Sequence, residues 1–233
     1  MKPAIHNEPW FDLLHLSSMA LPVGGFAYSQ GLEQAIEAGL INSPATAQRW
    51  IEDCARHNLS RQECVLWHRV FEAAKVRDVN QIVELNDLLF ALKETAELRL
   101  EARQMGQSFA GLFPKWPQAV WLCDLDLAPV GWTYTTAHAS LCASAGLSAL
   151  TGLTSFLWAW CENQVLCIVK HLPMGQSQGQ ALLQELKPVL ERIVLERLQS
   201  SQVCVSDKFG SAAVGFAINS ARHETQYSRL FRS

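Results

Sequence analysis

A serine between two glycines is the residue with the most obvious capacity for covalent chemistry. Ser177 lies between Gly175 and Gly179 in the G-x-S-x-G pattern of a nucleophile elbow, and Asp207 and His223 follow in the order of a Ser-Asp-His triad. Such an elbow needs a strand before it, whereas the preceding residues have mainly helical periodicity and offer no glycine-rich oxyanion segment. A serine hydrolase using Ser177 is therefore an alternative, and a loop between helices is favoured.

Three Cys/His pairs could bind a metal. Each pair is separated by four positions, which would place both side chains on one helical face where a soft divalent ion could bridge them: Cys64/His68, His138/Cys142 and Cys167/His171. Structural zinc needs four closed ligands, and no local cluster supplies them. Buried structural cysteines with histidines nearby are favoured, so we assign no metal ligand and expect the chain itself to bind no cofactor.

Nucleotide chemistry lacks its usual motif. The pattern G-x-x-x-x-G-K-[ST] does not occur, because no glycine in the sequence is followed by lysine. We therefore expect that the chain does not hydrolyse GTP or ATP itself, and that it is not an enzyme.

Composition and charge limit the classes of protein to which the chain could belong. The chain has 233 residues, of which 49% are hydrophobic and 18% charged, enough for one sizeable core. A formal net charge of -3 argues against nucleic-acid binding. The first residues lack the apolar run of a signal peptide, and the 7 cysteines include no C-x-x-C pair, so we expect a reduced, cytoplasmic protein.

The most apolar window, residues 146–169, could be mistaken for a membrane span. Glu162, Asn163 and Gln164 lie inside the segment of roughly 20 apolar residues that a span needs, and burying them in lipid would be costly. A central core helix is predicted instead. The three polar groups must then either form a satisfied core network or border a polar, water-filled passage.

Helix signals dominate the elements that would position these groups. Ser43 before Pro44 predicts a helix start, Gly39 a left-handed cap, and Asp78 the cap of a long helix that ends before Pro114. Residues 60–63 have the form of a capping box, and residues 203–205 are open to a strand interpretation. We predict a single all-α domain over residues 1–221, a bundle of about eight to ten helices, with a flexible tail at residues 222–233.

Two loops and the tail carry residues suited to contacts with another protein. Residues 21–33 combine Pro22, Gly24 and Gly25 with polar groups but hold no catalytic set, and an interhelical turn is the alternative. The tail, residues 222–233, mixes cations with Tyr227 and Phe231, residue types enriched at interfaces, although an exposed tail is usually disordered.

Taken together, these motifs resemble the UreF family of urease accessory proteins. The resemblance rests on residues 21–33, 94–99, 103–106, 157–165, 170, 172–176, 179–180 and 223–233, which are ordered along almost the whole chain. Residues before Trp10 and residues 107–128 carry little of it.

The resemblance implies an all-α, non-catalytic chaperone component. Such a protein would assemble with a UreD/UreH-type accessory protein and the GTPase UreG, regulate that GTPase, and help to deliver nickel into apo-urease. The resemblance also implies a homodimer. Nickel and GTP would be handled by the assembled complex, with no role for nucleic acid or membrane.

The resemblance also suggests which residues would contact partners. Tail residues would bind the UreD-type protein and order on contact: Arg222, Glu224, Tyr227, Arg229 and Arg232. Two loops would face partners in the assembly through Pro22, Gly24, Gly25, Tyr28, Ser29, Gln30, Lys170 and Gln176. If a polar passage exists, Glu162, Asn163 and Gln164 would border a route for nickel.

Overall fold

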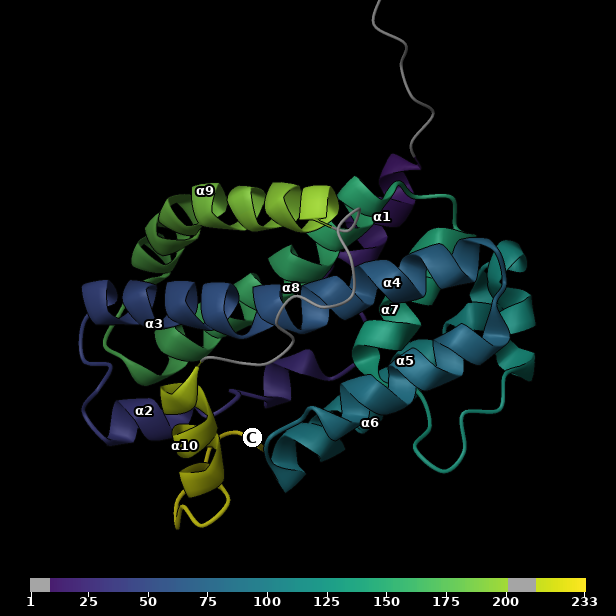
Figure 1. Ribbon diagram of the computed structural model, residues 1–233. Coiled ribbons are helices and arrows are strands. Elements are labelled where there is room, and N and C mark those ends of the chain that lie inside the picture. The colour runs from purple at the N-terminus through teal and green to yellow at the C-terminus, as the bar shows by residue number, and fades with distance from the viewer. Residues whose placement is uncertain (1–8, 201–212) are drawn as a thin grey trace, which may run out of the picture.

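The computed structural model describes residues 9–200 and 213–233. Within these ranges the chain is all-α and has no strand, as predicted (Figure 1). The α-helices are α1 (Trp10–Leu16), α2 (Leu32–Glu37), α3 (Pro44–His57), α4 (Glu63–Lys75), α5 (Val79–Ala91), α6 (Ala96–Ala110), α7 (Tyr134–Ser144), α8 (Ala149–His171), α9 (Gln176–Ser200) and α10 (Val214–His223). Short 3-10 helices are η1 (Gly25–Ala27), η2 (Leu59–Arg61), η3 (Phe113–Lys115) and η4 (Pro117–Asp124).

Several helix boundaries follow from local capping chemistry. The Ser43 side chain accepts a hydrogen bond from the Thr46 amide and Pro44 takes the first helical position, so α3 begins as predicted. Asp78 caps α5 through the Gln81 amide, and Gly39 is left-handed with φ +74°. These confirmed predictions concern contacts within a few residues.

Two predicted boundaries were wrong. Residues 60–63 form no capping box: Ser60 lies in η2, and Gln62 precedes α4 without a side-chain cap. The long helix expected after Asp78 is two helices, because the chain turns at residues 92–95 and Thr95 caps α6 through the Leu98 amide. The possible strand at residues 203–205 lies outside the described residues.

The central element is α8, the helix predicted from the most apolar window. It contacts α1, α2, α3, α4, α7 and α9, and Leu153, Leu157 and Ile168 along it are completely buried. Among the described residues, no helix combines the length and apolar character that crossing a bilayer would require. The prediction of a core helix is therefore confirmed.

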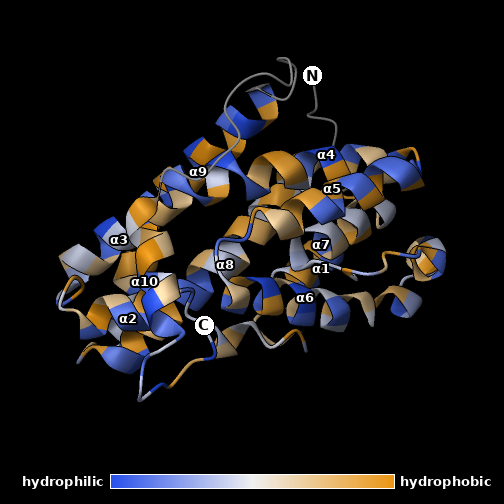
Figure 2. Cartoon of the chain, turned by 60° about the horizontal axis from the view of Figure 1, so that its bottom comes forward, coloured by the Kyte–Doolittle hydropathy of each residue, from blue (hydrophilic) through white to orange (hydrophobic). Residues whose placement is uncertain are grey.

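Small residues let the helices approach closely around α7. Ala137, Ala139 and Ser140 on α7 are fully buried, and α7 packs against α4 and α6. A β-carbon on Gly106 of α6 would lie 2.1 Å from the Trp132 carbonyl oxygen, so only glycine fits there. Figure 2 shows hydrophobic and hydrophilic residues alternating along most of the helices that surround this core.

The last helix, α10, packs against α2 on one side of the molecule (Figure 1). The contact is close: a β-carbon on Gly31 would lie 2.7 Å from the Ser220 amide nitrogen, and Gly31 has φ +76°. Residues 21–33 and the end of the chain are thereby brought together.

Candidate functional site

The backbone of the tail lies against the rest of the protein and forms hydrogen bonds with it. The amides of Leu230 and Phe231 donate to the Glu33 carboxylate over 2.6 and 2.9 Å. The Arg232 amide donates to the Ala27 carbonyl at 2.8 Å, and the Ser29 amide donates to the Ser233 carbonyl at 2.7 Å. Sequence reasoning missed this docking because the partners are some 200 residues apart.

Glu33 is the centre of this docking site. Its carboxylate is buried on α2 and also lies 3.2 Å from the ring nitrogens Nε2 of His171 and His223. Burial alone would raise the pKa of the Glu33 carboxyl, but hydrogen bonds from the two tail amides, His223 and His171 bring that pKa below its ordinary value. The structure therefore favours a charged carboxylate beneath the tail.

A second carboxylate continues the network. Glu97, in the first turn of α6, lies 2.7 Å from Nδ1 of His223 and 2.5 Å from Nη1 of Arg229. The Glu224 carboxylate accepts from the amides of Ala96 and Glu97, where the start of α6 leaves backbone donors free. Three elements, α2, α6 and α10, thus meet around His223.

The side chains of the tail divide between buried and exposed. Phe231 is buried against His171, with ring centroids 5.3 Å apart, and the Lys170 ammonium lies 5.4 Å from the Phe231 ring. Tyr227 is fully exposed. The other exposed side chains of the tail are Arg222, Glu224, Thr225, Ser228, Arg229, Leu230 and Arg232. The predicted tail residues therefore reach solvent, as a partner surface requires.

The first predicted partner loop is only partly accessible. Pro22 is exposed, and Gly24 has φ +75° with open space around it. Tyr28 and Ser29 are buried in the chain itself, which corrects the expectation that they face outward: Tyr28 donates its hydroxyl to Gln104, and Ser29 donates its hydroxyl to the Ser233 carbonyl. They hold the loop and the tail together.

The remaining loop residues have different surroundings. Gln30 is half-buried, and its amide group joins the Trp160 indole to the Glu101 carboxylate. Gly25 is half-buried beside Met105. Lys170 and Gln176, at the junction between α8 and α9, are exposed as expected. Whether any of these loops binds a partner stays a prediction.

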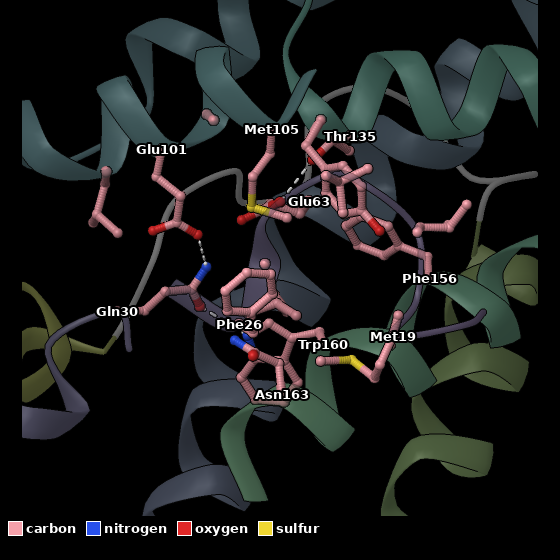
Figure 3. A pocket seen from close by; sticks show the side chains of 18 of the residues that line it. Met19, Phe26, Gln30, Glu63, Glu101, Met105, Thr135, Phe156, Trp160 and Asn163 are labelled. Atoms are coloured by element: carbon pink, nitrogen blue, oxygen red, sulfur yellow. Dashed lines mark hydrogen bonds between the residues drawn. The ribbon is translucent and has the colours of Figure 1, made fainter. Parts of the chain in front are cut away.

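Beneath the first loop lies a cavity of about 70 Å³ (Figure 3). Apolar side chains form most of its wall, among them Met19, Phe26, Met105 and Phe156. Glu101 reaches the cavity from α6 and accepts hydrogen bonds of 2.6 Å from Gln30 and from the Ser233 hydroxyl. Burial raises the pKa of the Glu101 carboxyl. The end of the tail and the wall of the cavity thus share one carboxyl group.

An ion pair occupies another wall of the cavity. The Lys93 ammonium lies 2.5 Å from Glu63, and the Thr135 hydroxyl donates to the other carboxylate oxygen at 2.7 Å. Although burial opposes charge on both groups, Lys93 holds the pKa of the Glu63 carboxyl below its usual range, and Glu63 holds the pKa of Lys93 above its own. The cavity therefore has a charged interior inside an apolar shell.

Of the three residues predicted to border a polar passage, one lines the cavity. Asn163 lines the cavity and donates to the Tyr28 carbonyl at 2.9 Å, while its side-chain oxygen has no hydrogen-bond partner among the described residues (Figure 3). Gln164 is buried, and Glu162 is half-buried with a carboxyl pKa raised by burial. Neither lines this cavity, and a passage through the three stays a prediction.

The hydrolase alternative finds no support in the geometry. Ser177 is exposed in the first turn of α9, with helix rather than strand before it. His223 directs both ring nitrogens at Glu33 and Glu97 and not at a serine. Asp207 lies outside the described residues.

In the described part of the chain, no group of three or more metal-binding side chains gathers around the Cys/His pairs. His138 is fully buried in an aromatic cluster, accepts from the Trp67 indole at 3.1 Å, and has its pKa lowered to about 3 by burial. Cys64 is buried, and His171 directs Nε2 at Glu33 and Nδ1 at the backbone carbonyl of Cys167, not at its thiol. Burial also raises the pKa of the Cys167 thiol to about 12, which keeps it protonated.

What the fold and the site together define is a helical protein with a docked tail, exposed cationic and aromatic side chains, and no assembled catalytic triad among the described residues. A family model described as UreF matches residues 41–187. The chain therefore belongs to the UreF family of urease accessory proteins, as the motifs predicted.

Several urease accessory proteins are similar to this chain over nearly its full length. A urease accessory protein UreF from Azoarcus sp. (strain BH72) is 41% identical, covering 99% of this chain and 98% of the relative. One from Cupriavidus metallidurans is also 41% identical, over 95% and 96% respectively. A bifunctional urease accessory protein UreEF from Bordetella bronchiseptica is 39% identical across 100% of this chain, which spans 54% of that protein.

Proposed function

We propose that this urease accessory protein bridges a UreD/UreH-type protein and the GTPase UreG, and so helps to mature the nickel centre of apo-urease. The observation that carries the proposal is the tail, whose backbone is fixed by Glu33 while Tyr227, Arg222 and Arg229 reach solvent. A fixed backbone that presents aromatic and cationic side chains costs little ordering entropy when a partner binds.

The fused relative supports an assembly role. In the bifunctional UreEF protein, a UreF portion is part of one longer chain with a second accessory function in its name. We propose that the present chain likewise works beside other accessory proteins, as a cytoplasmic homodimer that regulates UreG. Nickel is then the cargo of the assembly and not a resident cofactor of this chain.

The test is co-purification from a mixture of the purified UreD-type and UreG-type proteins, with and without GTP and nickel. Tyr227→Ala and Arg222→Ala should reduce capture of the UreD-type protein, and urease activation with it, because interface tyrosine and arginine side chains commonly contribute about 2 kcal/mol or more. Light scattering of the isolated chain checks the dimer.

Arg192→Ala on α9 is the matched control, since α9 lies on the opposite side of the molecule from α10 in Figure 1 and Arg192 is exposed. Point changes are preferable to deleting residues 222–233, because a deletion would leave the Glu33 carboxylate buried without its tail donors. Unchanged capture by both tail variants would refute the tail assignment.

A further inference from the structure

Glu101 is a buried carboxyl group on the cavity wall without a counter-ion of its own. Its oxygens accept hydrogen bonds of 2.6 Å from Gln30 and from the Ser233 hydroxyl. Among the described residues Glu101 belongs to no ion pair, because Lys93, the cation on the same wall, is paired with Glu63. The wall therefore carries two carboxyl groups and one ammonium group.

A buried carboxyl group without a cation either stays protonated or takes a cation from solution. Burial raises the pKa of the Glu101 carboxyl, so the protein alone stabilises its charge poorly. A positively charged ligand beside Glu101 would favour the ionised carboxylate and would balance the charges of the wall.

The cavity has room for such a ligand. Its volume is about 70 Å³. Because one water needs roughly 10 to 15 Å³ of such space, the cavity can hold one molecule of about five non-hydrogen atoms. Phe26 lines the cavity and is also 57% exposed, which places the mouth at the loop of residues 21–33 (Figure 3).

The lining favours an organic cation over a metal ion. The aromatic rings and thioethers on the wall belong to Met19, Phe26, Met105, Tyr134, Phe156 and Trp160. Aromatic rings attract organic ammonium groups, and methionine side chains adapt to an aliphatic chain. A metal ion needs several donor groups in one place, whereas the described part of the chain gathers no such group of three.

We propose that this cavity binds a small primary alkylammonium ion, with its nitrogen at Glu101 and its carbon chain against the aromatic and thioether side chains. Because Glu101 also accepts the Ser233 hydroxyl, the bound ion lies beside the end of the tail. The site is formed by this chain alone and does not depend on the partners proposed above.

The test follows the methionine methyl groups of the full-length protein by carbon-13 NMR. Met19 and Met105 line the cavity, and Met174 does not, so Met174 is the internal reference. At neutral pH, n-butylammonium chloride should shift the Met19 and Met105 signals in a saturable way and leave the Met174 signal in place. 1-Butanol has as many non-hydrogen atoms but no charge, and should bind about tenfold more weakly or worse.

Three outcomes would overturn the proposal. The first is the absence of a saturable shift with butylammonium. The second is equal or tighter binding of 1-butanol or butyrate. The third is a shift of the two cavity methionines with nickel chloride alone and not with butylammonium.

Matched variants locate the charge and the space. Glu101→Gln should weaken butylammonium binding about tenfold or more, whereas Glu84→Gln removes an exposed charge on α5 and should leave binding unchanged. Ala159→Leu puts a larger side chain into the cavity and should abolish binding, and Ala91→Leu at the exposed end of α5 should not. Full binding by Glu101→Gln refutes the proposal, and if that variant fails to fold, full binding by Ala159→Leu does so.

Discussion

Glu33 shows how much one side chain can organise. Its two oxygens accept two tail amides and face two histidine rings, and all of these partners lie far along the chain. Hydrogen bonds to a charged acceptor are stronger than neutral ones, and a buried carboxylate without them would be penalised. Glu33 therefore has a structural role: its hydrogen bonds hold the tail backbone in place, and the tail backbone in turn positions the exposed tail side chains.

Replacing Glu33 by Gln should destabilise the protein by roughly 2 kcal/mol at neutral pH, because charge-assisted hydrogen bonds are lost. The sign of the pH effect follows from the lowered pKa of Glu33. Its stabilisation is fully present above the ordinary carboxyl pKa of 4.5 and is lost as pH falls through the lower pKa of the folded state. Urea unfolding at several pH values measures the difference, which should shrink in acid.

Glu37→Gln on the same helix is the control for this prediction. Glu37 is exposed at the end of α2, so its substitution should change the free energy of unfolding by less than about 0.5 kcal/mol. Equal effects of the two substitutions would show that the Glu33 contacts contribute nothing special.

At the scale of elements, close helix approach depends on single glycines. Gly106 lets α6 lie against the backbone just before α7, where there is no room for a β-carbon. Sequence reasoning did not single out Gly106, because nothing local to residue 106 shows that Trp132 comes near.

Gly106→Ala should destabilise the protein by about 2 to 4 kcal/mol, since the contact is with backbone atoms that cannot rotate away. Gly175→Ala is the matched control: no atom lies within 4 Å of its added β-carbon. Thermal unfolding of the two variants tests the difference, and similar melting temperatures would contradict it.

Helix starts show where sequence reasoning succeeds and where it fails. Ser43 with Pro44, and Asp78, were predicted correctly because a cap involves only the next few residues. The break at residues 92–95 was missed because no proline or glycine marks it, although Thr95 as an N-cap was a readable signal. The docking of the tail on Glu33 and the pairing of Lys93 with Glu63 depend on tertiary contacts, which no local pattern reports.

At the scale of the whole molecule, a charged interior sits within an apolar core. Lys93 connects the turn between α5 and α6 to Glu63 at the start of α4, beside the cavity. Taking charges out of water is costly, and an ion pair in such a place holds together only while both members remain.

Lys93→Met should therefore cost about 3 to 5 kcal/mol, because it leaves the Glu63 charge without its counter-ion. The double change Glu63→Gln with Lys93→Met should cost less than Lys93→Met alone, since no unpaired charge is left. Chemical unfolding of the three proteins measures this. A double variant less stable than Lys93→Met would mean that the cavity wall needs the charges themselves.

The tail and the residues that it contacts, 27–33, lie at opposite ends of the sequence, and this has a consequence for biosynthesis. Ser29 and Ser233 form a hydrogen bond although 204 positions separate them. Glu33 and its hydrogen-bond donor, the amide of Phe231, are 198 positions apart. A polypeptide that leaves the ribosome N-terminus first must keep these early polar groups in water until its last residues emerge. The loop at residues 27–33 is thus among the first segments to be translated and among the last to acquire its final shape.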